Sequence, residues 1–105
     1  GSAVAGNVLL TLFDANGLPV VSSASTAQAG TAAYQAVPFS APTTVIGPAT
    51  YFVGLECSSV SARFRSHIIN TMGASKKTGE TYGTFTAVTP PTTFTADVAP
   101  ILDVY

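Results

Sequence analysis

The sequence has very little charge. Only 9% of its 105 residues are Asp, Glu, Lys or Arg, whereas about 25% is usual for a soluble domain, and 47% are apolar. The cations are Arg63, Arg65, Lys76 and Lys77, and the formal net charge is −1. Two separated pairs of cations are too few for binding nucleic acid by phosphate neutralisation. Ser, Thr, Ala and Gly must then cover much of the surface, which suits permanent contact with other chains.

Cysteine, histidine and tryptophan are nearly or wholly missing. Cys57 is the only cysteine, so an internal disulfide is impossible, and we expect this side chain to be buried as a small hydrophobe. His67 is the only histidine, and one Cys with one His supplies half of a zinc shell. The sequence therefore predicts no metal and no cofactor.

Long hydrophobic runs are absent as well. No segment approaches the roughly 18 apolar residues of a membrane helix, and no charged region precedes the apolar run at residues 8–10 as it would in a signal peptide. The sequence predicts no contact with a membrane. Residues 1–2, Gly-Ser, look like a cloning scar, and residues 3–105 are predicted to form a single domain.

What the sequence does contain is a series of short β-branched and aromatic runs separated by turn signals. Asn16-Gly17 indicates a hairpin, because both residues tolerate a positive φ. About eight short strands with almost no helix predict an all-β fold, an antiparallel β-sandwich of jelly-roll type. The predicted strands and edge segments are residues 8–13, 18–23, 33–39, 43–46, 51–57, 60–69, 82–88, 92–95 and 101–105, with one helical turn near 69–74.

Alternation along these strands predicts the core. Successive side chains of a strand point to opposite faces. In 51–57 this places Val53, Leu55 and Cys57 on one face, opposite Gly54 and Glu56. The residues predicted to be mostly buried are Leu10, Leu12, Val53, Leu55, Phe64 and Phe85.

Three protonatable or cationic side chains share the face of the predicted strand 60–69 that lies opposite to Phe64. They are Arg63, Arg65 and His67, about 6.6 Å apart along the strand. A solvated outer face paired with Glu56, a contact to a neighbouring subunit, and a site for an acidic glycan are all compatible with this row. Together with Tyr82 it forms the candidate interface or ligand face.

Four tyrosines allow a second hypothesis. Tyr34, Tyr51, Tyr82 and Tyr105 could form a sugar platform, although such rings more often pack at the edge of a core. Catalysis is not predicted. The chain has no Gly-x-Ser-x-Gly elbow, and no two carboxylates share a strand face at a useful spacing.

Asp14 and Asn16, with Glu56, could be read as calcium ligands. The segment Asp14-Ala15-Asn16-Gly17 imitates the start of an EF-hand loop, but Ser25 stands where the required Glu would be. The chemistry of a tight turn accounts for the same residues. The sequence therefore favours a turn without metal.

The order of several segments resembles β-sandwich domains of tailed-bacteriophage virion proteins. These segments are Leu-Leu-Thr-Leu-Phe-Asp-Ala-Asn-Gly-Leu-Pro-Val at 9–20, Gly-Pro-Ala-Thr-Tyr-Phe-Val-Gly-Leu at 47–55, Ser-Ala-Arg-Phe-Arg at 61–65, Thr-Pro-Pro-Thr-Thr-Phe-Thr at 89–95 and Ala-Pro-Ile at 99–101. The resemblance implies a non-enzymatic structural domain of a head fibre, capsid-decorating protein or tail fibre. It also implies location in the virion, a homotrimer, contact with other virion proteins, and weak attachment to surface glycans as a secondary role.

A second resemblance covers only the first half of the chain. Asp14-Ala15-Asn16-Gly17 and the turn at 47–51 are similar to prealbumin-like domains of bacterial adhesins. Some of those domains carry a Lys–Asn isopeptide bond, but residues 8–13 contain no Lys. An adhesin or carbohydrate-binding module is therefore the alternative function.

Overall fold

The computed structural model describes residues 6–29, 34–60, 62, 66–69, 77–90 and 97–100, with the backbone alone in 66–69 and 97–100. These residues form strands and no helix, so none of them belongs to a helix that could cross a membrane. The fold of this part is all-β, and every paired strand is antiparallel. The strands are β1 (Asn7–Phe13), β2 (Pro19–Ser22), β3 (Thr26–Ala27), β4 (Phe52–Cys57), β5 (Ser66–Ile69) and β6 (Asp97–Pro100).

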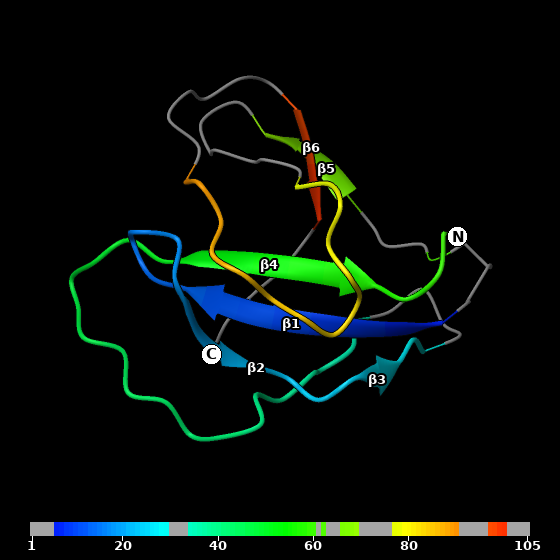
Figure 1. Cartoon of the computed structure of the whole chain (residues 1–105), viewed down its shortest axis with the longest axis horizontal. Coiled ribbons are helices and arrows are strands. Elements are labelled where there is room, and N and C mark those ends of the chain that lie inside the picture. Colours follow the sequence, from blue (N-terminus) through cyan, green and yellow to red (C-terminus); the bar gives the residue numbers. More distant parts are fainter. Residues whose placement is uncertain are drawn as a thin grey trace.

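Strand β1 is the centre of a four-stranded sheet (Figure 1). It pairs with β4 along one edge, from Val8 opposite Cys57 to Phe13 opposite Phe52. Along its other edge it pairs with β3 near its start and with β2 near its end. β5 and β6 form a separate two-stranded sheet, which Figure 1 shows above β4. The predicted strands 8–13 and 51–57 are thus confirmed.

The hairpin between β1 and β2 turns at the predicted place. The Gly17 amide donates to the Asp14 carbonyl (3.0 Å), and the Asp14 amide donates to the Leu18 carbonyl (2.9 Å). Gly17 has φ of 80°, whereas no non-glycine residue of the described ranges has a positive φ. Asn16 is therefore not left-handed, and the turn is a three-residue loop that closes with a left-handed glycine.

Pairing and alternation give the sheet two faces. The front face carries Phe13 and Gly54, and Glu56 lies further along the same row of β4. The back face carries Val8 and Leu12 of β1, because residues of opposite parity point to the opposite side. Both faces of β1 are covered. Val8, Leu9, Leu12 and Phe13 are at most 7% exposed, and Thr11 is fully buried.

The predicted core is confirmed where it is described. Leu12 is buried, and Leu10, Val53, Leu55 and Phe85 are largely buried, though less completely. Phe64 lies outside the described residues. The best-buried ring is Phe13, which the prediction omitted because the whole apolar run at 8–13 gives no clear period from which to choose a face.

Segment 77–90 is not a strand, although 82–88 was predicted to be one. It crosses the front of the sheet over β4 and β1 (Figure 1). Phe85 meets Phe13 edge to face, with ring centroids 5.9 Å apart, and the Val88 amide donates to the Gly17 carbonyl (2.8 Å). Side-chain packing and isolated backbone hydrogen bonds hold this segment against the sheet, and no β-ladder does so.

Several further strand predictions differ from the structure. Residues 43–46 are exposed and form no strand. Of the predicted strand 33–39, the described residues form only a single bridge, between Phe39 and Ser23. Within the predicted strand 60–69, the described strand is β5, which pairs with β6 and not with β4. β6 itself was not predicted. The predicted segments 92–95 and 101–105 lie outside the described residues.

Candidate interaction surface

Residues 40–50 form an exposed, uncharged arm in the connection from β3 to β4. Its sequence is Ser-Ala-Pro-Thr-Thr-Val-Ile-Gly-Pro-Ala-Thr, which contains no charged residue, and every one of these residues is exposed. Figure 1 shows the arm as a wide loop leaving the lower edge of the sheet and returning at the start of β4. No other described stretch is exposed over so many consecutive residues.

The arm is tied to the domain near both of its ends. At the first end, the Ser40 amide and hydroxyl both donate to the Ser22 carbonyl, at 2.9 and 2.7 Å. At the second end, the Tyr51 hydroxyl donates to the Ile46 carbonyl (3.0 Å) and accepts a bond from the Ile46 amide (3.2 Å). A loop whose backbone is held before binding loses less conformational entropy when it binds.

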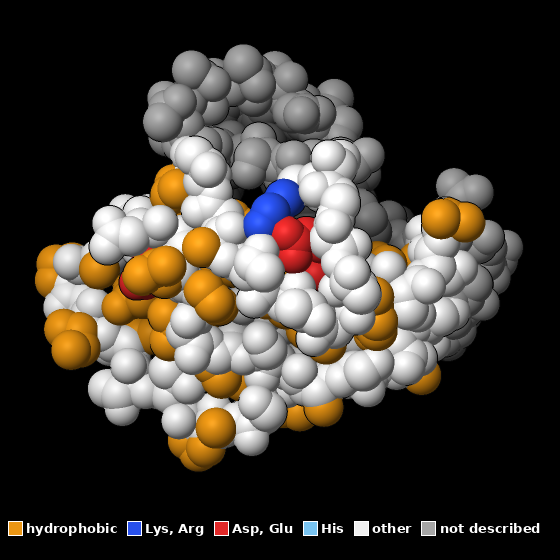
Figure 2. All heavy atoms as spheres, viewed as in Figure 1, with side chains coloured by type: hydrophobic (Ala, Val, Ile, Leu, Met, Phe, Trp, Pro, Cys, Tyr) orange, Lys and Arg blue, Asp and Glu red, His pale blue; other side chains and the backbone are white. Residues whose placement is uncertain are grey.

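Apolar side chains are exposed on the arm and on the hairpin. On the arm, Val45 is 50% and Ile46 80% exposed; on the hairpin, Leu18 is 51% and Val20 43% exposed. Hydrophobic side chains gather on the left side of Figure 2, where Figure 1 places both the arm and the hairpin turn. Large exposed apolar patches on soluble proteins commonly mark interaction sites.

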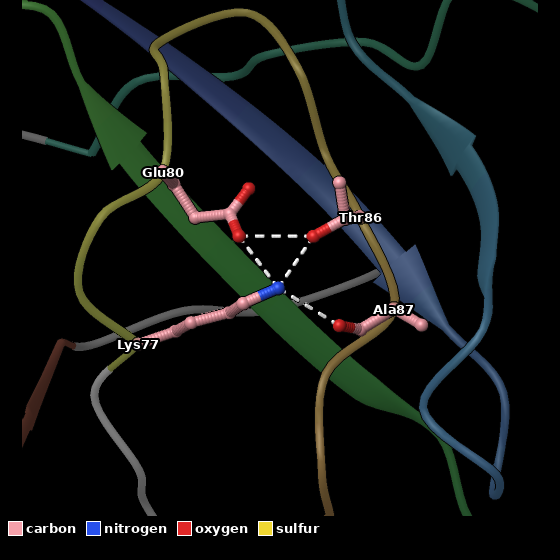
Figure 3. A network of polar contacts seen from close by, with 4 residues as sticks. All are labelled: Lys77, Glu80, Thr86 and Ala87. Carbon is pink, nitrogen blue, oxygen red and sulfur yellow. Dashed lines mark hydrogen bonds and ion pairs between the residues drawn. The ribbon is translucent and has the colours of Figure 1, made fainter.

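Two of the described charged side chains, Lys77 and Glu80, form an ion pair elsewhere, in segment 77–90. Lys77 Nζ contacts Glu80 Oε1 (2.5 Å), donates to the Ala87 carbonyl (2.9 Å) and also bonds the Thr86 hydroxyl (Figure 3). The Thr86 hydroxyl donates to Glu80 Oε1 (2.9 Å). We call these contacts among Lys77, Glu80, Thr86 and Ala87 the polar clasp; they join the first part of segment 77–90 to its later part. The polar clasp sits in the upper middle of Figure 2, away from the arm.

The clasp predicts a pH dependence. Hydrogen bonds from Lys77 and then from Thr86 lower the pKa of Glu80 below its ordinary value. A depressed carboxyl pKa adds stability above the unfolded-state pKa of about 4.3, and that stability is lost as the pH falls through the folded-state pKa. We expect the pKa of the Glu80 carboxyl, followed in an NMR pH series, to lie below its ordinary value and to rise towards that value in Lys77→Met. An unchanged titration in Lys77→Met would contradict the clasp.

Two more side-chain bonds hold segment 77–90 onto the sheet. The Gly83 amide donates to Glu56 Oε2 (2.9 Å), and the Tyr82 hydroxyl and Ser25 Oγ are 2.7 Å apart. Glu56 Oε1 is buried without a hydrogen-bond partner. Glu56 therefore faces segment 77–90, and its carboxylate binds that segment.

The predicted ligand face of Arg63, Arg65, His67 and Tyr82 stays a prediction, because most of its side chains lie outside the described residues. Arg63 and Arg65 lie outside the described residues, and only the backbone of His67 is described, in β5 opposite Ala99. Tyr82 lies in segment 77–90, where its hydroxyl bonds Ser25. The three interpretations of the Arg63, Arg65 and His67 row stay predictions.

The other candidate residues serve local structure. Asp14 Oδ1 accepts bonds from the amides of Asn16 (2.9 Å) and Leu18 (3.0 Å), as expected of a turn. No three His, Cys, Asp or Glu side chains gather within the described ranges. Of the tyrosines in the predicted sugar platform, Tyr51 bonds Ile46, Tyr82 bonds Ser25 and Tyr34 is 83% exposed, and the platform stays a prediction. Tyr105 is outside the described residues.

The exposed arm is the feature that sequence reasoning missed. The β-branched residues at 43–46 predict a strand, but β-propensity carries no information about whether a ladder partner exists. The sequence does indicate a break at residues 40–42 and a turn at 47–49, but not that the residues between them lack a ladder partner. Comparison of the chain with protein-family models, with curated proteins and with solved structures found no match.

Proposed function

We propose that this chain is a non-enzymatic structural domain of a bacteriophage particle, and that it associates with further copies of itself as a homotrimer. Other virion proteins are its further partners, and weak attachment to surface glycans is a secondary role. In this proposal the sheet around β1 is one layer of a jelly-roll sandwich, and the sheet of β5 and β6 belongs to the second layer.

The exposed, uncharged and tethered arm supports the self-association in this proposal, and the virion role rests on the sequence resemblance. Covering Val45 and Ile46 with a neighbouring chain removes apolar surface from water, which is favourable by about 25 cal/mol per Å². The arm contains no charge, so an interface there pays no desolvation penalty for an ion. The low charge of the whole sequence supports the same view, because an isolated monomer would have few charges to keep it soluble.

We expect Ile46→Asp to weaken self-association at least about 100-fold. A carboxylate at the centre of an apolar contact loses its hydration without gaining a partner, and about 2.7 kcal/mol corresponds to that factor. Light scattering coupled to size-exclusion chromatography, over a micromolar concentration series, measures the effect as a fall in mass. Because Ile46 is 80% exposed, the substitution should leave the fold intact, which circular dichroism checks.

The matched control is Thr78→Asp, which adds the same charge at another exposed position. This variant should keep the mass of the parent protein. A parent protein that stays monomeric at high concentration would rule out the structural role. Binding of such a monomer on a glycan array would then favour the alternative, an adhesin or carbohydrate-binding module.

A further inference from the structure

The pair Asn16-Gly17, in the turn between β1 and β2, carries the groups for a reaction within the chain. Asn is a thermolabile residue, and the side chain of Asn16 is exposed to water. The amide nitrogen of the next residue can attack the Asn side-chain carbonyl, and glycine has no Cβ to obstruct the approach. The bond from this nitrogen to Cγ forms, the bond from Cγ to Nδ2 breaks, and the leaving group takes the amide proton and departs as ammonia. Water then opens the succinimide ring to an aspartyl or an isoaspartyl residue.

The turn holds the attacking nitrogen of Gly17 in a hydrogen bond. The Gly17 amide donates to the Asp14 carbonyl (3.0 Å), and the Asn16 amide donates to Asp14 Oδ1 (2.9 Å). The nitrogen attacks only after it loses the proton that it donates to Asp14, and the two bonds also fix the peptide groups on either side of Asn16. The reaction is therefore slow while the turn is closed.

Segment 77–90 packs against the same glycine from outside the turn. Gly17 is buried, although Asn16 and Leu18 on either side of it are exposed. The Val88 amide donates to the Gly17 carbonyl (2.8 Å), and a Cβ atom at Gly17 would lie 1.9 Å from the Val88 carbonyl oxygen. Gly17 is thus held through both its amide and its carbonyl. Rotating it towards the Asn16 side chain requires segment 77–90 to move away.

We propose that Asn16 is a deamidation site, and that the docking of segment 77–90 on Gly17 keeps this site closed. When the segment lifts, only the bonds to Asp14 still hold the turn. The product has a new carboxylate two residues from that of Asp14, and an isoaspartyl product also adds a methylene group to the backbone of the turn. Both changes weaken the hairpin, and neither reverses when the segment docks again. This inference is independent of the proposed self-association.

Mass spectrometry with peptide mapping tests the proposal on the parent chain, incubated at mildly alkaline pH. The mass gained when an amide becomes an acid is assigned to Asn16. Asn7 precedes the β-branched Val8, which obstructs the attack, so Asn7 serves as the internal standard that stays intact. The folded chain should deamidate at Asn16 at least about tenfold more slowly than the chain unfolded in urea, because only the opened fraction reacts. Equal rates would overturn the proposal.

Two variants separate the docking of segment 77–90 from the stability of the whole domain. Phe85→Ala removes the ring that packs the segment on Phe13, whereas Leu55→Ala removes a side chain from the opposite face of the sheet. Urea denaturation gives the unfolded fraction of each variant, and the deamidation that this fraction contributes is subtracted. The corrected rate at Asn16 should then be at least about threefold higher in Phe85→Ala than in Leu55→Ala.

Equal corrected rates would mean that the segment does not close the site, and would overturn the proposal. Hydrogen exchange of the Gly17 amide in the parent chain adds a test that needs no substitution. This amide should exchange at least about tenfold more slowly than in the unfolded chain, because its bond to Asp14 must open first. An unprotected Gly17 amide would also overturn the proposal.

Discussion

Replacing Gly17 with alanine is expected to destabilise the domain by at least about 3 kcal/mol, through two separate effects. Gly17 has φ of 80°, which side chains other than glycine rarely adopt. A Cβ atom at this position would also lie 1.9 Å from the Val88 carbonyl oxygen and 2.9 Å from its carbon. The hairpin or segment 77–90 must shift, and the bond from the Val88 amide to the Gly17 carbonyl is then lost. Chemical denaturation followed by circular dichroism measures the loss.

Gly79→Ala is the matched control. Gly79 has φ of 83°, but a Cβ atom there would meet nothing within 4 Å. Gly79→Ala should therefore lower the stability only through the unfavourable positive φ, by about 1–2 kcal/mol. The difference between the two variants isolates the close approach of the hairpin to Val88. Equal losses would show that segment 77–90 does not rest on the hairpin as the structure has it.

Truncating Phe13 to alanine is expected to remove about 3–5 kcal/mol of stability. The ring is 2% exposed, touches Phe85 edge to face and lies close over Gly54, where a Cβ atom would be 2.7 Å from Phe13 Cε2. The absence of a side chain at Gly54 is what makes room for this ring. Removing the ring leaves a cavity between the sheet and segment 77–90, which the backbone can fill only in part.

Phe85→Ala should cost less, because Phe85 is half-buried. A double-mutant cycle of the two substitutions should give a coupling of about 0.5–1.5 kcal/mol, the range for edge-to-face aromatic pairs. Strict additivity in that cycle would contradict the contact between the rings. Denaturant midpoints and slopes, measured under the same conditions for all four proteins, supply the values.

The parts of the fold that follow from local sequence were predicted correctly. β1 and β4 are runs of β-branched and large apolar residues, and Asp14 with Gly17 specifies the turn between β1 and β2 through its own hydrogen bonds. Such features need no knowledge of distant residues. The burial of Thr11 cannot be predicted from its neighbours in sequence, because it depends on a hydrogen bond between the hydroxyls of Thr11 and Ser22, 2.7 Å apart on paired strands.

The candidate surface could not be predicted in the same way. Residues 43–46 and 82–88 both have the composition of strands, yet one is exposed and the other crosses the sheet without joining it. Whether a β-prone segment joins a ladder depends on a free edge at the right place, which is a property of the whole fold. The same holds for Tyr51, whose role in holding Ile46 appears only when the arm has its shape.

The central position of β1 affects how the chain leaves the ribosome. β1 is made before β4, its partner on one edge, which follows roughly forty residues later. At the usual 5–20 residues per second this interval lasts roughly 2–8 s. During that time the hydrophobic residues of Asn7–Phe13 have only the hairpin to β2 and the short β3 to cover them. During this interval the nascent chain carries an apolar strand that lacks its β4 partner, and pairing with β2 covers part of one edge of that strand, which reduces edge-to-edge aggregation during synthesis.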